Sequence, residues 1–197
     1  MMKRDRLLEL LKKTGALLEG HFLLSSGLHS DKYIQCAKLL QYPDIAEEIG
    51  RALALRFAHE RLPAPDLVAS PALGGLIIGH EVASALNVRH IFIEKDSDGK
   101  PALRRGFDIK KGEKFLVAED VVTTGKSTRE VLDVLRAIGG EPVAIGAIVD
   151  RSSGRKLPFE GIPLIALEKL DIATYDPKDC PLCAKGIAVV KPGSRKQ

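Results

Sequence analysis

The chain of 197 residues contains no tryptophan and only six phenylalanines and three tyrosines, so its core has to be built from aliphatic side chains. It has three cysteines, an odd count that does not suit a disulfide scaffold and favours a reducing cytoplasm. No apolar run approaches the roughly 18 residues of a membrane-spanning helix, and no signal peptide follows the charged N-terminus. We therefore expect a cytoplasmic protein that has no membrane partner.

The overall composition is that of an ordinary globular protein, with 45% hydrophobic and 28% charged residues. This balance excludes a disordered tail and a coiled coil. The net charge of +4 is too small to indicate a nucleic-acid partner, but it suits an anionic small substrate that is steered into a cleft. The length favours one domain with additions.

Two copies of one pattern occupy the middle of the chain. Each copy begins with a short apolar strand, passes through a turn or polar loop into a helix, and returns as a strand. The predicted elements are a helix at 3–13, a short strand around 33–34 and a helix at 43–60, then strand 66–69, helix 76–86, strand 89–94, strand 115–118, helix 127–138 and strand 142–149. This order predicts an α/β fold, a Rossmann-like parallel sheet with helices on both faces. Residues 176–197 are expected to be irregular.

The most informative segment is 119–127, which reads Glu-Asp-Val-Val-Thr-Thr-Gly-Lys-Ser. Two acids follow a buried strand, and a turn rich in hydroxyls then enters a helix. Such a helix N-terminus offers free N–H groups to a phosphate, while the acids suit sugar hydroxyls or a hydrated Mg²⁺. A nucleotide-binding P-loop is excluded because Asp120 stands where its first glycine is required. The pattern therefore predicts a phosphorylated sugar ligand.

Segment 119–127 resembles the phosphoribosyl-pyrophosphate signature of the type I phosphoribosyltransferases. The resemblance implies a core parallel sheet under a small hood, contributed by about 1–40 and 150–197, in a single domain spanning 1–197. It implies that Glu119 and Asp120 hold the ribose hydroxyls. It also implies that the remaining residues of the segment contact the donor, and that residues 123–127 bind its 5-phosphate. The donor contacts are then Val121, Val122, Thr123, Thr124, Gly125, Lys126 and Ser127.

Two further segments resemble the orotate phosphoribosyltransferases. One runs from Gly20 to Tyr33 and the other from Val149 to Gly154, and the similarity extends over nearly the whole chain, in the form found in thermophilic bacteria. The resemblance implies that Ser26, Gly27, Tyr33 and Arg151 contact the orotate base. A planar guanidinium can bind the carboxylate and ring carbonyls of orotate in a fork, which supports Arg151 independently.

The leaving pyrophosphate needs its own contacts. Residues Ala72, Leu73 and Gly74 form a glycine-rich turn whose backbone amides could cradle it. Relatives often carry lysine at the positions of Ser25 and Gly74. Residues 95–111 are expected to form a flexible basic loop. The loop resembles the closing loops of this family, and the resemblance implies that its cations act in catalysis together with Asp120. Its candidate cations are Lys95, Lys100, Arg104 and Arg105.

The expected reaction joins orotate to 5-phosphoribosyl 1-diphosphate and yields orotidine 5′-monophosphate and pyrophosphate, a step of pyrimidine biosynthesis. The resemblance implies Mg²⁺, held through substrate and water with no side-chain ligand, and a homodimer. Two alternatives are a purine phosphoribosyltransferase and a non-enzymatic regulator that senses the donor. Arg151 speaks against the first, and the short N-terminal segment leaves no room for the second's nucleic-acid-binding domain.

The pair Cys180-x-x-Cys183 is left with three interpretations. A structural zinc site takes four ligands, and neither Cys36 nor any of the five histidines lies near the pair in sequence. A redox pair normally opens a helix after a strand, whereas this one encloses Pro181. A local structural role is therefore favoured, with metal binding and redox chemistry as alternatives.

Overall fold

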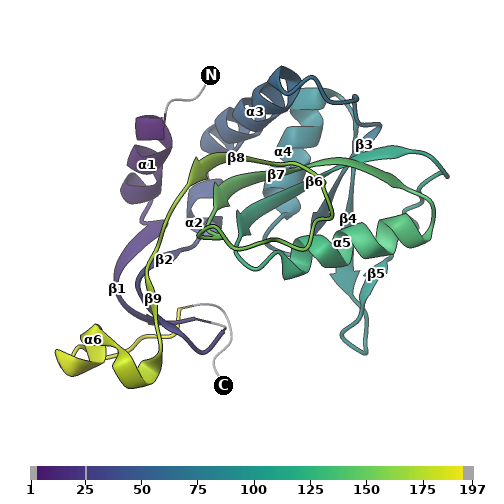
Figure 1. Cartoon of the computed structure of the whole chain (residues 1–197). Coiled ribbons are helices and arrows are strands. Elements are labelled where there is room, and N and C mark those ends of the chain that lie inside the picture. The colour runs from purple at the N-terminus through teal and green to yellow at the C-terminus, as the bar shows by residue number, and fades with distance from the viewer. Residues whose placement is uncertain (1–3, 25, 193–197) are drawn as a thin grey trace.

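The computed structural model describes residues 4–24 and 26–192, and its main layer is a six-stranded sheet in the order β5-β4-β3-β6-β7-β8 (Figure 1). Every neighbouring pair is parallel except β4 and β5, which form an antiparallel hairpin. The strands are β3 (Leu67–Pro71), β4 (Arg89–Lys95), β5 (Pro101–Leu103), β6 (Lys114–Val122), β7 (Glu141–Asp150) and β8 (Leu164–Lys169).

Helices cover both faces of this sheet because its central strands are apolar on both sides. Successive side chains of a strand point to opposite faces. Accordingly, Leu116 joins the core cluster that includes residues of α3 (Pro43–His59) and α4 (Leu76–Leu86). Its neighbour Val117 joins the second cluster, which includes residues of α5 (Lys126–Ala137). The carboxyl ends of β3, β6 and β7 therefore meet at one edge of the sheet, between two helical layers.

A small antiparallel sheet lies beside the carboxyl edge of the large one (Figure 1). It consists of β1 (Leu17–Leu23), β2 (His29–Ile34) and β9 (Thr174–Tyr175), so it joins the two ends of the chain. Three more short elements accompany it: α2 (Ala37–Leu40), η1 (Pro177–Asp179) and α6 (Pro181–Ala184). Helix α1 (Arg4–Lys13) inserts Leu7, Leu10 and Leu11 into the first core cluster.

The predicted α/β architecture is confirmed, and the elements predicted between residues 43 and 149 lie within a few residues of their expected bounds. Strands β1, β5, β8 and β9 were not predicted. The end of the chain, expected to be irregular, contains η1 and α6 within its described part. Residues 95–103 belong to the β4–β5 hairpin, whose turn is closed by Asp96 Oδ1 accepting from the backbone amides of Asp98 and Lys100. Among the described residues, no helix is long and apolar enough to cross a bilayer.

Candidate active site

Segment 119–127 spans the end of β6, a tight turn and the first turn of α5. Gly125 is the N-cap of α5 and has a φ of 75°, a left-handed conformation that glycine adopts without steric cost. A Cβ atom at this position would lie 2.8 Å from the Phe159 ring. The turn opens onto a pocket of about 310 Å³, lined by Lys95, Val122, Thr123, Thr124, Gly125, Lys126, Ser127 and Glu130. It presents free N–H groups and the positive end of the helix dipole.

The two acids lie behind this turn. Glu119 is 4% exposed, and its Oε2 accepts a 2.7 Å hydrogen bond from the Ser127 hydroxyl. Burial and the neighbouring Asp120 carboxylate raise the pKa of Glu119 to about 8. Burial also raises the pKa of Asp120, whose Oδ1 accepts a 2.7 Å hydrogen bond from the Val121 amide.

No described residue forms an ion pair with Glu119 or Asp120. Two adjacent carboxylates of this kind are stabilised when a hydroxyl donor or a hydrated divalent cation approaches them. The donor set consists of oxygens, which Mg²⁺ prefers, so these residues fit the cation that the family resemblance implies. Asp120 lines the larger of the two cavities at this site, whereas Glu119 lines neither of them.

A larger cleft of about 720 Å³ lies between the end of β6 and the small sheet. It shares Thr123, Thr124 and Lys126 with the 310 Å³ pocket, called the turn pocket below, so the two cavities adjoin along the turn. Eight of the site residues predicted from the sequence line this cleft: Ser26, Tyr33, Asp120, Val121, Thr123, Thr124, Lys126 and Arg151. Gly27 does not line the cleft but turns the chain between Ser26 and Leu28, with a φ of 83°.

Arg151 and Tyr33 face this cleft from different elements. Arg151 follows the last residue of β7, and its backbone amide donates a 2.8 Å hydrogen bond to the Val122 carbonyl, which anchors it beside β6. Burial lowers the pKa of the Arg151 guanidinium, while its electrostatic interaction with Tyr33 raises it. The pKa of the Tyr33 hydroxyl is raised by burial and by Asp120. Among the described residues Arg151 has no carboxylate partner, so its guanidinium is available to an anionic ligand.

The expected pyrophosphate turn lies next to the acids. A Cβ atom on Gly74 would be 3.1 Å from both carboxylate oxygens of Asp120, so a side chain here would require the Asp120 carboxylate to shift by a few tenths of an ångström. Leu73 is 82% exposed, and the peptide bond between Ala72 and Leu73 is cis. The turn therefore places the backbone of Gly74 close to Asp120.

Comparison with known proteins assigns this arrangement to a family. A phosphoribosyl transferase domain model matches residues 36–162. The chain is 50% identical over 195 residues to the orotate phosphoribosyltransferase of Caldanaerobacter subterraneus subsp. tengcongensis, covering 99% of this chain and 100% of that protein. It is 52% identical over 196 residues to the enzyme of that name from Caldicellulosiruptor bescii, covering both chains completely.

The chain belongs to the orotate phosphoribosyltransferase family. The crystal structure of the orotate phosphoribosyltransferase from Aeropyrum pernix superposes with a TM-score of 0.71 at 30% identity, covering 83% of this chain and 93% of that one. The resemblance of segment 119–127 to this family is thus confirmed, and so is the parallel sheet that it implies. The similarity extends over the full length, including the N-terminal strands and the C-terminal segment, which lie outside the domain match.

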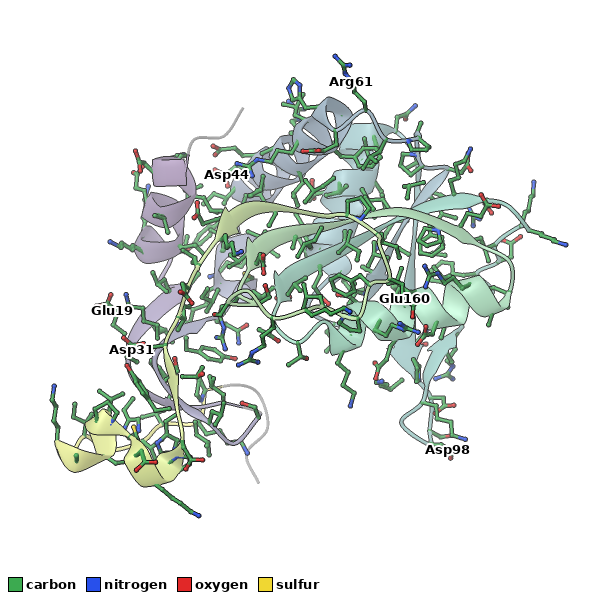
Figure 2. All side chains as sticks on the ribbon, viewed as in Figure 1. Glu19, Asp31, Asp44, Arg61, Asp98 and Glu160 are labelled. Atoms are coloured by element: carbon green, nitrogen blue, oxygen red, sulfur yellow. The ribbon has the colours of Figure 1, made fainter. Side chains whose placement is uncertain are left out.

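The four loop cations of this phosphoribosyltransferase differ in position. Lys95 lines the turn pocket and forms an ion pair with Glu130. Arg105 forms a bidentate pair with Glu94, both contacts being 2.8 Å, and Arg104 lies 3.8 Å from the same carboxylate. Lys100 belongs to the turn whose Asp98 projects away from the sheet (Figure 2). Of these four, only Lys95 lines either cavity.

Sequence reasoning missed much of the cleft wall. The unpredicted lining residues are Leu24, Leu28, Ile34, Gln35, Ser153, Arg155, Asp171, Ile172, Ala173 and Thr174. Residues 171–173 precede β9 and Thr174 begins it, and they reach the cleft because β9 pairs with β2 across more than 140 residues of sequence. Ser153 and Arg155 follow Arg151 closely, and that proximity is the one signal that could have found them. Ser25 lies outside the described residues.

Proposed function

We propose that this chain transfers the 5-phosphoribosyl group from 5-phosphoribosyl 1-diphosphate to orotate, which gives orotidine 5′-monophosphate and pyrophosphate in pyrimidine biosynthesis. The observation that carries the proposal is a pair of adjoining cavities that share the turn at 123–126. They present a helix N-terminus for a phosphate, Asp120 for a sugar and, for an anionic base, Arg151, which has no carboxylate partner in the described part of the chain. The names of the full-length relatives support the same reaction.

The donor's 5-phosphate is placed on the turn at 123–127, where backbone amides and the Lys126 ammonium group would bind it. This position brings the ribose hydroxyls toward Asp120, and the pyrophosphate toward the backbone of 72–74. Mg²⁺ bound through donor oxygens and water beside the acids would neutralise part of the pyrophosphate charge. Glu119 acts behind Asp120 by fixing Ser127 through its hydrogen bond.

The chemistry requires no nucleophilic side chain. The bond between the anomeric carbon and the pyrophosphate oxygen breaks, the sugar becomes oxocarbenium-like, and the ring nitrogen of orotate forms the new bond as its proton passes to the released pyrophosphate or to water. The protein contributes positioning, charge stabilisation and exclusion of water. Lys95 lines the turn pocket, so its ammonium group can stabilise the charge of a phosphate bound there within the same chain.

Orotate is placed against Arg151, Tyr33 and Ser26, on the wall formed by the small sheet and the end of β7. A guanidinium fork there binds the orotate carboxylate, and a neutral purine offers no such group. This difference favours a pyrimidine substrate over the purine alternative. The names of the full-length relatives, all of them transferases, disfavour the regulator.

We also propose a cytoplasmic homodimer in which the β4–β5 hairpin reaches the partner's site. The support is the position of Lys100, Arg104 and Arg105, which line neither of the two cavities at the site although they are the cations expected at the pyrophosphate. A hairpin that projects from the sheet edge is placed to contact a second copy (Figure 1).

A direct assay tests the reaction. The purified chain is incubated with the donor, Mg²⁺ and one base at a time from orotate, uracil, adenine and hypoxanthine, and pyrophosphate release is measured. We expect turnover with orotate at a rate at least about a hundredfold above that with any other base, because only orotate leaves Arg151 paired. Comparable turnover of a purine would overturn the assignment of the acceptor.

A further inference from the structure

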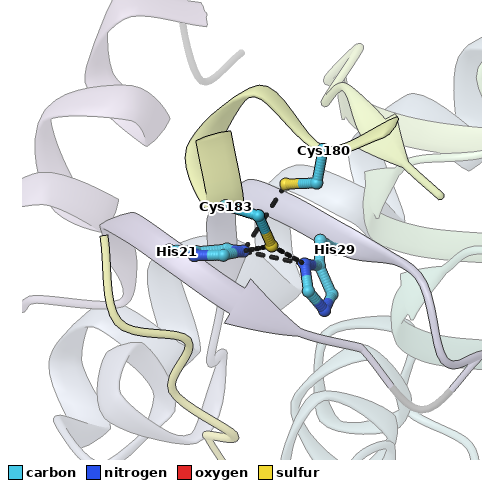
Figure 3. Close-up of side chains that lie close together, drawn as sticks. All are labelled: His21, His29, Cys180 and Cys183. Carbon is cyan, nitrogen blue, oxygen red and sulfur yellow. Dashed lines mark hydrogen bonds between the residues drawn. The ribbon is translucent and has the colours of Figure 1, made fainter. Parts of the chain in front are cut away.

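A second cluster of reactive side chains lies outside the cleft, where the small sheet meets the C-terminal segment (Figure 3). His21 comes from β1, His29 from β2, and Cys180 and Cys183 from the N-cap and body of α6. One potential ligand atom from each of the four lies within 4.8 Å of all the others. Three of the residues are buried, with His21 at 2%, Cys180 at 3% and His29 at 7% exposure.

The distances match those of a tetrahedral zinc site. Bonds of about 2.3 Å to sulfur and 2.0–2.1 Å to nitrogen place neighbouring sulfur and nitrogen ligands about 3.5 Å apart. Here Cys180 Sγ lies 3.5 Å from His21 Nε2, and Cys183 Sγ lies 3.8 Å from His21 Nε2 and 3.4 Å from His29 Nδ1. The two imidazole nitrogens are 2.8 Å apart and would need to separate by about half an ångström around the ion.

The surroundings also prepare His21 as a ligand. Its Nδ1 lies 2.7 Å from the carbonyl oxygen of Ile187, which can only accept a hydrogen bond. Nδ1 must therefore carry the proton, and the lone pair of Nε2 points at the other three residues. Backbone carbonyls commonly hold the second nitrogen of metal-bound histidines in this way.

The cluster lies where the C-terminal segment is attached to the rest of the fold by few other contacts. Residues 181–192 contain no buried residue, so they contribute little to either core cluster. Their backbone links to β1 are two hydrogen bonds, from the Leu23 amide to the Val190 carbonyl and from the Val190 amide to the His21 carbonyl. A metal ion would add a strong crosslink between this segment and the β1–β2 hairpin, whose tip carries Ser26 and Leu28 to the cleft.

We propose that His21, His29, Cys180 and Cys183 bind one Zn²⁺ ion in a closed structural site that fixes the C-terminal segment to the β1–β2 hairpin. Two thiolates and two imidazoles suit Zn²⁺, whereas Mg²⁺ prefers oxygen ligands. Four protein ligands leave no open position, so the ion stabilises the fold and takes no part in the transfer reaction. This site is independent of the proposed function, because it contains none of the residues assigned to the cleft.

Metal analysis of the full-length chain tests the proposal. The protein is purified without a histidine tag or chelator, equilibrated with Zn²⁺ and freed of excess ion by gel filtration. We expect about one zinc per chain by mass spectrometry, falling below about a tenth in the Cys180→Ser/Cys183→Ser double variant. Replacement by Co²⁺ should give the intense visible bands of a tetrahedral site and a thiolate charge-transfer band.

Matched variants separate ligation from general damage to the fold. His29→Ala should lose the metal, whereas His29→Cys should retain it because three cysteines and one histidine also form a zinc site. His59→Ala, on the exposed end of α3, should keep the full zinc content. A wild-type chain that takes up neither Zn²⁺ nor Co²⁺, or that holds Cys180 and Cys183 in a disulfide, would overturn the proposal. Because the wild-type cobalt spectrum needs no variant, a misfolded variant does not leave the question open.

Discussion

The hydroxyl of Ser127 donates a 2.7 Å hydrogen bond to Oε2 of Glu119, and this contact joins the first turn of α5 to the buried end of β6. It fixes the turn at 123–127 relative to the acid pair, although Glu119 itself lines neither cavity. Under the proposed function, Glu119 is therefore a positioning residue, and Asp120 is the acid placed to contact the donor.

Glu119 should make the stability of the substrate-free protein depend on pH. Its pKa is raised from 4.5 to about 8 in the fold, so the native state binds more protons than the unfolded state between these values. The free energy of unfolding should then fall as the pH rises through that range, by up to ~1.4 kcal/mol per pH unit. Glu119→Gln should remove the part of this fall that Glu119 causes and leave any part due to Asp120, as measured by urea unfolding at a series of pH values.

The exposed Glu19→Gln variant is the control for Glu119, and its unfolding should follow the wild-type pH dependence. If Glu119→Gln and wild type lose stability in parallel between pH 5 and about pH 8, Glu119 is ionised in the native protein and its raised pKa is refuted.

Asp120→Asn should weaken use of the donor. Loss of a charged partner for the ribose hydroxyls should lower kcat/KM for the donor by about 10- to 100-fold, since a hydrogen bond to a charged group contributes about 1.5–3 kcal/mol. Steady-state kinetics with each substrate varied in turn measure this effect. Asp44→Asn, on the exposed first turn of α3, should leave the rate unchanged. An unaltered rate in Asp120→Asn would contradict the ribose contact.

The sequence could predict the parts of the site that are contiguous in the chain. Apolar strands such as 67–71 and the run from Glu119 to Ser127 carry their own signals, because buried parallel strands are apolar and phosphate turns use glycine and hydroxyls. Strand β2 carries a much weaker signal, since its Ser30-Asp31-Lys32 is polar and its pairing with β9 is set by distant residues. The cluster of His21 with Cys180 was missed for the same reason, since 159 positions separate them.

Arg151→Ala should impair orotate far more than the donor. The guanidinium has no carboxylate partner among the described residues, so its removal frees no buried acid and mainly deletes a ligand contact. The KM for orotate should rise about tenfold or more, and Arg151→Lys should restore little because an ammonium group cannot form the fork. Arg51→Ala, exposed on α3, is the matched control. Equal increases in both KM values would refute the assignment.

Gly125→Ala should cost more stability than an alanine at another left-handed glycine. Both Gly125 and Gly161 have positive φ values, of 75° and 86°, so each substitution adds about 1–2 kcal/mol of backbone strain. At Gly125 the new Cβ also meets the Phe159 ring at 2.8 Å, whereas at Gly161 nothing lies within 4 Å. The difference between the two variants in free energy of unfolding should be about 1–3 kcal/mol. Equal losses would show that the Phe159 ring yields freely.

The proposed exchange of hairpins in a dimer can be tested by mixing two impaired chains. One chain carries Asp120→Asn and the other carries Lys100→Ala with Arg104→Ala, so each lacks a different part of the site. If the hairpin serves the partner's cleft, one site of each mixed dimer is intact, and random reassociation should restore about a quarter of the wild-type activity. If the hairpin serves its own cleft, every site in the mixture carries a defect. The rate should then stay at the level of the separate variants, which would refute the exchange even when light scattering confirms a dimer.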